Sequence, residues 1–121
     1  MKAIINDHLR RTHNGYQALT QATQANFVIM GGVCAMSGGA VVTVPLGSPA
    51  AIHDGVTITF VSNSNQAHVI NAGSAIIKGK PGDGAAYTTV TFPAFSGSSV
   101  ILTAVSGFWL ASSNNGTTVW A

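Results

Sequence analysis

The sequence predicts an all-β fold: an antiparallel β-sandwich, barrel or jelly-roll-like body that follows an N-terminal arm. From Phe27 onward, short runs rich in Val, Ile, Thr and Phe alternate with Gly, Ser, Asn and Pro, a pattern typical of strands joined by tight turns. Hydrophobic residues form 46% of the 121 residues and charged residues only 7%, whereas disordered chains combine low hydrophobicity with high charge. The chain is therefore expected to fold as one domain with a largely neutral surface.

Residues 1–26 differ in composition from the rest and form the predicted arm, and residues 27–121 form the predicted β-domain. The first thirteen residues carry a net charge of +2, whereas the charges in the remainder cancel. The stretch YQALTQATQAN is compatible with a short helix or an extended tether, because an isolated helix of this length is marginal in water. The charges of the arm are Lys2, Arg10 and Arg11 against Asp7.

Nine strands are expected in the β-domain. The first, FVIMGGVCAM, is the most apolar run of the chain, and Gly, Ser, Asn or Pro separates nearly all of those that follow. In chain order the expected strands are residues 27–36, 40–45, 56–62, 67–71, 74–78, 87–92, 99–105, 108–112 and 117–120.

The segment DGVTITFVSNSNQAHVI predicts a hairpin. Val56, Ile58 and Phe60 fall on one face of its first strand, and Thr57, Thr59 and Val61 fall on the other. A five-residue polar turn over residues 62–66 separates it from a second apolar run. The outer face offers threonine where a soluble strand would ordinarily show lysine or glutamate. Burial against copies of the same chain would explain this, because interface cores are depleted in charge.

Two further turns have glycine signatures. VILTAVSGFWLASS alternates on both sides of Ser106-Gly107, where glycine supplies the positive φ of a two-residue hairpin turn. Asn115-Gly116 predicts a second tight turn, which would join the two strands of a second hairpin. Asn115-Gly116-Thr117 also matches the N-glycosylation pattern, but no signal peptide is recognisable at the start of the chain, so the turn is the preferred interpretation.

The sequence contains no constellation of catalytic residues, and we expect no enzyme activity. The aspartates, Asp7, Asp54 and Asp83, lie in different segments, and the last two adjoin glycine, as turn formers do. No GxSxG elbow is present. The stretch GSAIIKGKP fails as a phosphate-binding loop because its glycine spacing is wrong and Pro81 replaces the Ser or Thr that would hold magnesium.

No cofactor and no metal site are expected. His8 and His13 lie in the arm near Asp7, where they would make at most a weak site, and His68 is expected to be a hydrogen-bonded histidine within an apolar strand. Cys34 is the single cysteine. It is expected to be a buried thiol, and no disulfide within the chain is possible.

The aromatic residues have two interpretations. Trp109 and Trp120 would suit a sugar-binding platform. With other aromatic side chains nearby, however, they are more typical of a core or a subunit interface. The candidates for a subunit interface are Phe92, Phe95, Phe108, Trp109 and Trp120.

Nucleic-acid and membrane functions are not expected. Three cations in the arm are too few for useful phosphate affinity, and the most apolar run, ten residues long, is too short to cross a bilayer. No apolar stretch follows closely on a short basic start, as it would in a signal peptide, so synthesis in the cytoplasm is expected.

Two stretches, DGVTITFVSNSNQAHVI and ILTAVSGFWLASSNNGTTV, together resemble segments of small β-domains in tailed-bacteriophage virion proteins. In those proteins a DG-x-TITF strand is followed by an LTAV-x-G-x-W hairpin and an SSN-G-x-TV end. The likeness covers roughly residues 52–119. A polar residue often precedes the tryptophan where this chain has Phe108, and residues 1–26 match no part of the pattern.

The resemblance implies a structural protein of the virion, made in the host cytoplasm. The expected function is that of a capsid decoration (cement) protein, a homotrimer bound to the major capsid protein on the outer surface of the head. The alternative is a carbohydrate- or receptor-binding β-domain of a head or tail fibre. Under the first hypothesis the arm contacts the capsid. The candidates for that contact are Lys2, His8, Arg10, Arg11 and His13.

Overall fold

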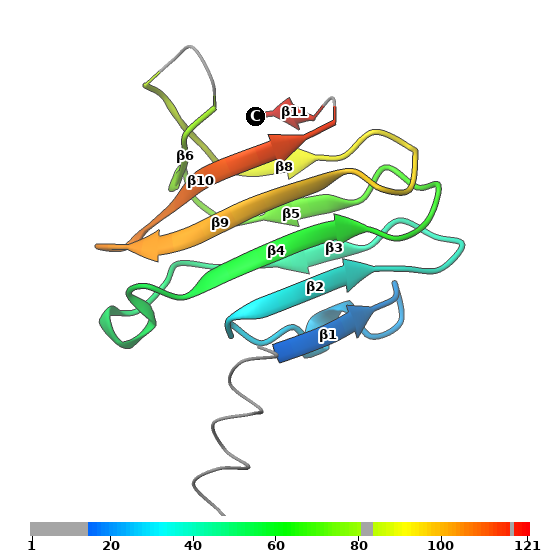
Figure 1. Cartoon of the computed structure of the whole chain (residues 1–121), viewed down its shortest axis with the longest axis horizontal. Helices are drawn as coiled ribbons and strands as arrows, with labels where there is room; N and C mark the ends of the chain where they lie inside the picture. Colours follow the sequence, from blue (N-terminus) through cyan, green and yellow to red (C-terminus); the bar gives the residue numbers. More distant parts are fainter. Residues whose placement is uncertain (1–14, 81–83, 117) are drawn as a thin grey trace, which may run out of the picture.

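The computed structural model describes residues 15–80, 84–116 and 118–121, and they form an all-β fold of two mixed sheets. The prediction of an all-β body is confirmed. The sheets lie in two layers, with the larger one in front in Figure 1. Short 3₁₀ turns, η1 (Gln24–Asn26) and η2 (Ala51–His53), lie in the connections.

The larger sheet has seven strands in the order β1-β2-β4-β9-β10-β6-β7. Their bounds are β1 Gly15–Leu19, β2 Gly32–Met36, β4 Thr57–Ser62, β9 Ser99–Val105, β10 Phe108–Asn115, β6 Ile77–Lys78 and β7 Ala86–Tyr87. The smaller sheet has the order β11-β8-β5-β3. Its strands are β11 Val119–Trp120, β8 Thr89–Thr91, β5 Val69–Asn71 and β3 Thr43–Pro45.

Both sheets are mixed, whereas the sequence predicted antiparallel pairing throughout. The pairs β1–β2, β2–β4, β10–β6 and β3–β5 are parallel. For β2–β4 and β3–β5 the cause is the path of the chain, which alternates between the two sheets from β2 to β5. Each crossing reverses the chain direction. Strands two apart in sequence therefore become parallel neighbours in the same sheet.

One predicted hairpin is confirmed and two are wrong. β9 and β10 pair antiparallel around Ser106 and Gly107, whose φ values of 50° and 84° suit a type I′ turn. β4 and β5 were expected to pair, but they lie in different sheets. The same holds for β10 and β11, so the chain at Gly116 crosses between sheets instead of closing a hairpin.

The core lies between the sheets. The predicted alternation in β4 is confirmed, because Ile58 and Phe60 are fully buried while Thr57 is exposed. Val44, Ile70 and Val90 from the smaller sheet join the same buried cluster.

The β-body includes residues that were predicted to belong to the arm. Residues 15–26 were assigned to the arm, but Gly15–Leu19 forms β1 and pairs in parallel with β2. Buried Leu19 anchors this strand in the core. The strand expected at residues 27–36 is confined to Gly32–Met36. Residues 1–14, the rest of the predicted arm, lie outside the described residues.

Candidate interaction surface

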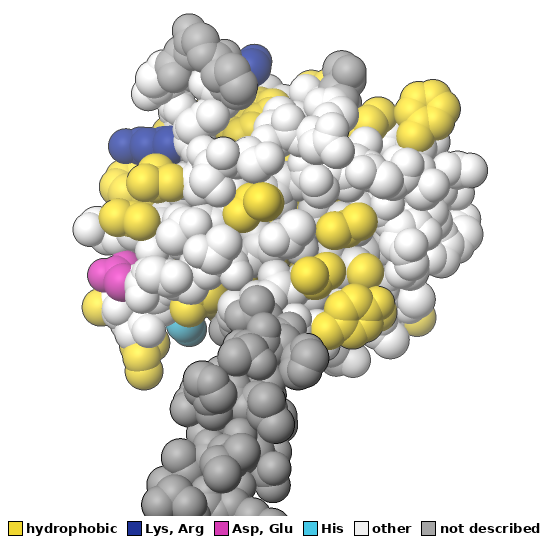
Figure 2. All heavy atoms as spheres, viewed as in Figure 1, with side chains coloured by type: hydrophobic (Ala, Val, Ile, Leu, Met, Phe, Trp, Pro, Cys, Tyr) yellow, Lys and Arg dark blue, Asp and Glu magenta, His cyan; other side chains and the backbone are white. Residues whose placement is uncertain are grey.

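The most distinctive surface of the molecule is the outward face of five strands of the larger sheet, β1, β2, β4, β9 and β10, here called the outer face. The strand registers place one set of side chains outward and the alternate set in the core. The outward set is Tyr16, Ala18, Val33, Ala35, Thr57, Thr59, Val61, Ser99, Ile101, Thr103, Val105, Phe108, Leu110, Ser113 and Asn115. None of these side chains is charged, and Figure 2 shows no charged side chain over the middle of this face.

The polar groups of the outer face are partly satisfied within the face. The hydroxyls of Thr57 and Thr103, on neighbouring strands, lie 2.9 Å apart and hydrogen-bond to each other. In the next outward row Thr59 lies beside Ile101. Over β1, β2, β4 and β9 this surface can pack against another protein without desolvating a charge, which is the main cost of burying charged surface.

The charged side chains of the described residues lie at the margins of the larger sheet. The Nζ of Lys78 lies 3.9 Å from the centre of the Phe108 ring, and the Nζ of Lys80 lies 5.4 Å from that of Tyr87. Both distances are within the range of cation–π attraction. At another margin, Oδ1 of Asp54 accepts a hydrogen bond of 3.0 Å from the backbone N–H of Ser106. Asp54 is thus a turn-supporting residue, as predicted.

Three of the five predicted interface aromatics belong to the core. Phe92, Trp109 and Trp120 are exposed by only 1%, 0% and 7%. They are buried within their own chain, which leaves little of their side chains to contact another subunit or to stack on a sugar. Phe95 is 70% exposed, and Phe108 is half-buried on the outer face.

Both tryptophan side chains hydrogen-bond within the fold. The Nε1–H of Trp109 donates to the carbonyl oxygen of Gly47 at 2.9 Å, and that of Trp120 donates to Oγ1 of Thr118 at 2.8 Å. The sequence patterns could not separate core from interface here, because both environments favour aromatic residues. The predicted capsid contacts Lys2, His8, Arg10, Arg11 and His13 lie outside the described residues.

His68 has the structural role that was predicted for it. Its Nδ1 accepts a hydrogen bond of 2.9 Å from the backbone N–H of Val42, so the neutral ring carries its proton on Nε2, which donates to Oγ of Ser64 at 2.8 Å. The side chain is fully buried. Burial lowers its pKa below the ordinary value of 6.5.

Nucleophilic and metal-binding groups are dispersed over the described part of the chain. Cys34 is buried, and desolvation raises the pKa of its thiol to about 12. Nδ1 of His53 accepts a hydrogen bond from the backbone N–H of Ala50. No three His, Cys, Asp or Glu side chains among residues 15–80, 84–116 and 118–121 lie close enough together to hold a metal ion.

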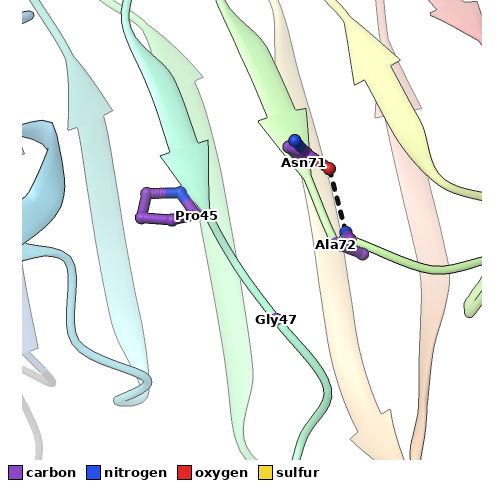
Figure 3. Close-up of a pocket in the computed structure, with 5 residues that line it drawn as sticks. Pro45, Gly47, Asn71 and Ala72 are labelled. Carbon is purple, nitrogen blue, oxygen red and sulfur yellow. Dashed lines mark hydrogen bonds between the residues drawn. The ribbon is translucent and has the colours of Figure 1, made fainter.

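A hollow of about 230 Å³ opens where β3 and β5 end (Figure 3). It is lined by Pro45, Gly47, Asn71, Ala72 and Gly73. Asn71 is the one polar side chain in this lining, and its Oδ1 already accepts a hydrogen bond of 2.9 Å from the backbone N–H of Gly73. A second hollow, of about 160 Å³, is lined by small and polar residues from Gly79 and β10. Neither lining contains a titratable side chain.

The sequence interpretation missed one part of the outer face. Tyr16 and Ala18 were assigned to the arm, but they stand at the edge of the outer face, on β1. In the structure, Tyr16 and Ala18 of the segment GYQAL are exposed while Leu19 is buried. Five residues were too few to reveal a strand next to a glutamine-rich stretch.

No protein-family model, curated protein or solved structure gives a significant match to this chain. Among the described residues, no helix has the length and apolar character needed to cross a bilayer.

Proposed function

We propose that this chain is a structural protein that binds, through its outer face, to a larger protein assembly, as a capsid decoration protein of a tailed bacteriophage. The observation that carries the proposal is the absence of charge from the outward side chains of β1, β2, β4, β9 and β10. The resemblance of residues 52–119 to β-domains of virion proteins supports it.

The physical argument concerns the cost of leaving this face in water. Exposed apolar side chains such as Tyr16 (65%), Val33 (36%) and Leu110 (37%) stand among threonines and serines. Large exposed patches of this kind mark interaction sites in soluble proteins, and interface cores are depleted in charge. The proposed partner is the major capsid protein, with further copies of the chain beside it on the outside of the head.

A charge placed in the middle of the outer face tests the proposal. Thr59→Lys introduces an ammonium group at a half-buried outward position of β4, where it can reach water in the free protein but is trapped in a docked interface. The matched control is Thr91→Lys, at a half-buried position in the smaller sheet. Both variants are added to undecorated heads, and the bound copies are counted after sedimentation.

We expect Thr59→Lys to bind at least about tenfold more weakly, which is the effect of roughly 1.4 kcal/mol, while Thr91→Lys binds like the wild type. Thermal melts verify that both variants are folded. Equal binding by Thr59→Lys and the wild type would reject the outer face as the docking surface.

The arm is tested separately. Deletion of residues 1–14 removes no residue of β1 and none of the described core. If the arm contacts the capsid through its three cations, this deletion weakens binding to heads and makes it less dependent on salt. Unchanged binding would leave the outer face as the attachment surface by itself.

A further inference from the structure

β1 forms one edge of the seven-stranded sheet, and half of its backbone groups point away from that sheet. The N–H of Gly15 donates to the carbonyl oxygen of Gly31 at 3.0 Å, and the carbonyl oxygen of Leu19 accepts from the N–H of Ser37 at 2.8 Å. Alternate residues of a parallel ladder bond to the same neighbour. Tyr16 and Ala18 alternate with these residues along the strand. Their N–H and C=O groups therefore point away from β2, and no described residue pairs with them.

The other edges in the described part of the fold are shortened or blocked. On β3, the N–H of Thr43 donates to Oε1 of Gln24 at 2.8 Å, and Pro45 has no N–H to offer. β7 and β11 are two residues long. Proteins usually protect sheet edges in these ways or with charged residues. β1 has five residues, none of them proline or charged.

The side chains beside this edge are apolar and held in place. Tyr16 is 65% exposed and Val28 is 57% exposed. In Figure 2 hydrophobic side chains gather over the corner of the face formed by β1 and β2. The amide of Gln17 makes two hydrogen bonds with the backbone of Val28, of 2.8 and 3.1 Å. These two bonds fix the backbone of Val28 to β1.

We propose that the free edge of β1 pairs antiparallel with β1 of a second copy, about a twofold axis at Gln17. In this register Tyr16 of each copy lies opposite Ala18 of the other, and these two residues carry the outward backbone groups. Each such pair exchanges two N–H···O bonds, and the large ring of Tyr16 covers the small methyl of Ala18. The edge is complementary to itself, which is why a second copy is the occupant.

The pairing makes one continuous sheet of two copies and gives a closed dimer. A five-residue edge buries less surface than the 1,200 Å² or so of a stable complex, so the dissociation constant is expected to be about 1 µM or weaker. A twofold pair differs from the trimer that the family resemblance implies. The inference does not depend on the proposed function, because it concerns the backbone groups of the β1 edge, although the side chains of Tyr16 and Ala18 also belong to the outer face.

Sedimentation equilibrium of the full chain, from about 10 µM to about 1 mM, tests the pairing. The wild type is expected to follow a monomer–dimer equilibrium. Ala18→Pro removes an N–H that bonds no described residue, and Ala18→Lys adds a charge at an exposed position. Each is expected to weaken dimerisation at least tenfold. Val119→Lys, on an edge strand of the smaller sheet, is the control and is expected to match the wild type.

A cysteine cross-link tests the register. Gln17 faces its own symmetry mate in a non-hydrogen-bonded pair, where the Cβ atoms are close enough for a disulfide. Under mild oxidation Gln17→Cys is therefore expected to form a covalent dimer much faster than Val119→Cys, while buried Cys34 does not compete.

A wild type that stays monomeric up to about 1 mM would overturn the pairing, as would a trimer without a dimer or equal rates for the two cysteine variants. Thr59→Lys, which lies on β4 and not on the edge strand, is measured in the same sedimentation series. Weaker binding of Thr59→Lys to heads together with unchanged dimerisation supports both proposals, and each result fails independently of the other.

Discussion

Gly32 is the position at which a single methyl group should separate β1 from the sheet. A Cβ at this position would lie 1.9 Å from the carbonyl oxygen of Gly15 and 2.6 Å from its backbone N and C. These are backbone atoms, so no side-chain rotation relieves the overlap. The φ of Gly32 is 119°, a conformation that residues with a side chain rarely adopt. Gly32→Ala therefore forces β1 to move away or β2 to change its path.

The cost has two parts. Backbone strain at such a φ is about 1–3 kcal/mol. Release of β1 exposes Leu19, now only 3% exposed, at a cost of about 1.5–3 kcal/mol, and part of this is offset by the chain entropy that β1 regains. We expect the free energy of unfolding to fall by about 3 kcal/mol, within a range of about 2–5. The melting temperature should fall by roughly 10–15 °C for a domain of this size.

The neighbouring glycine provides a matched control. A Cβ on Gly31 would lie 3.7 Å from the carbonyl oxygen of Thr57, an ordinary contact, and its φ is not positive. Gly31→Ala is therefore expected to change stability by less than about 1 kcal/mol. Both variants are compared with the wild type by urea titration and thermal melts. If Gly32→Ala unfolds within about 1 kcal/mol of Gly31→Ala, the placement of β1 against β2 is wrong.

Three other predictions concern the core. Because burial lowers the pKa of His68, the unfolded chain takes up a proton more readily than the folded one. The free energy of unfolding should therefore fall as the pH drops below about 6.5, and His68→Gln should flatten this dependence in urea titrations. Trp109→Phe removes the hydrogen bond to the carbonyl oxygen of Gly47 and should cost at least about 1 kcal/mol, measured by thermal melts. Cys34 should react with a thiol reagent only after denaturant is added, and EDTA or dithiothreitol should leave the melting temperature unchanged.

The sequence predicted the positions of the strands better than it predicted which strands pair with each other. Alternation and glycine placed β4, β9 and β10 within one to three residues of their observed bounds. These signals are local, since a strand shows its buried face in its own residues. The type I′ turn at Ser106-Gly107 is equally local, and it fixed the one hairpin that was predicted correctly.

Pairing between distant strands left no comparable signal. Along the sequence, a strand of the other sheet lies between parallel neighbours such as β2 and β4. No turn residues in the sequence indicate that arrangement. The outer face was predicted in part, from the threonines of β4. Its extension to Tyr16 and Ala18 depends on the pairing of β1 with β2, which no residue of β1 specifies.

The segment DGVTITFVSNSNQAHVI was predicted to form a hairpin, but its two strands lie in different sheets. It shows how a buried polar residue can indicate that the chain crosses between sheets. A buried histidine needs two hydrogen-bond partners, because an unpaired polar group in the core costs about 1–3 kcal/mol. In a simple β4–β5 hairpin, His68 would lie beside the inward side chains of β4, of which Ile58 and Phe60 offer no partner and Ser62 offers a single hydroxyl. In the observed fold, Nδ1 of His68 accepts a hydrogen bond from the N–H of Val42, 26 residues earlier in the chain. This bond joins the residue before β5 to the residue before β3. A histidine at the start of an apolar run thus requires polar partners from outside that run, and here the chain just before β3, the neighbour of β5 in the smaller sheet, supplies one of them.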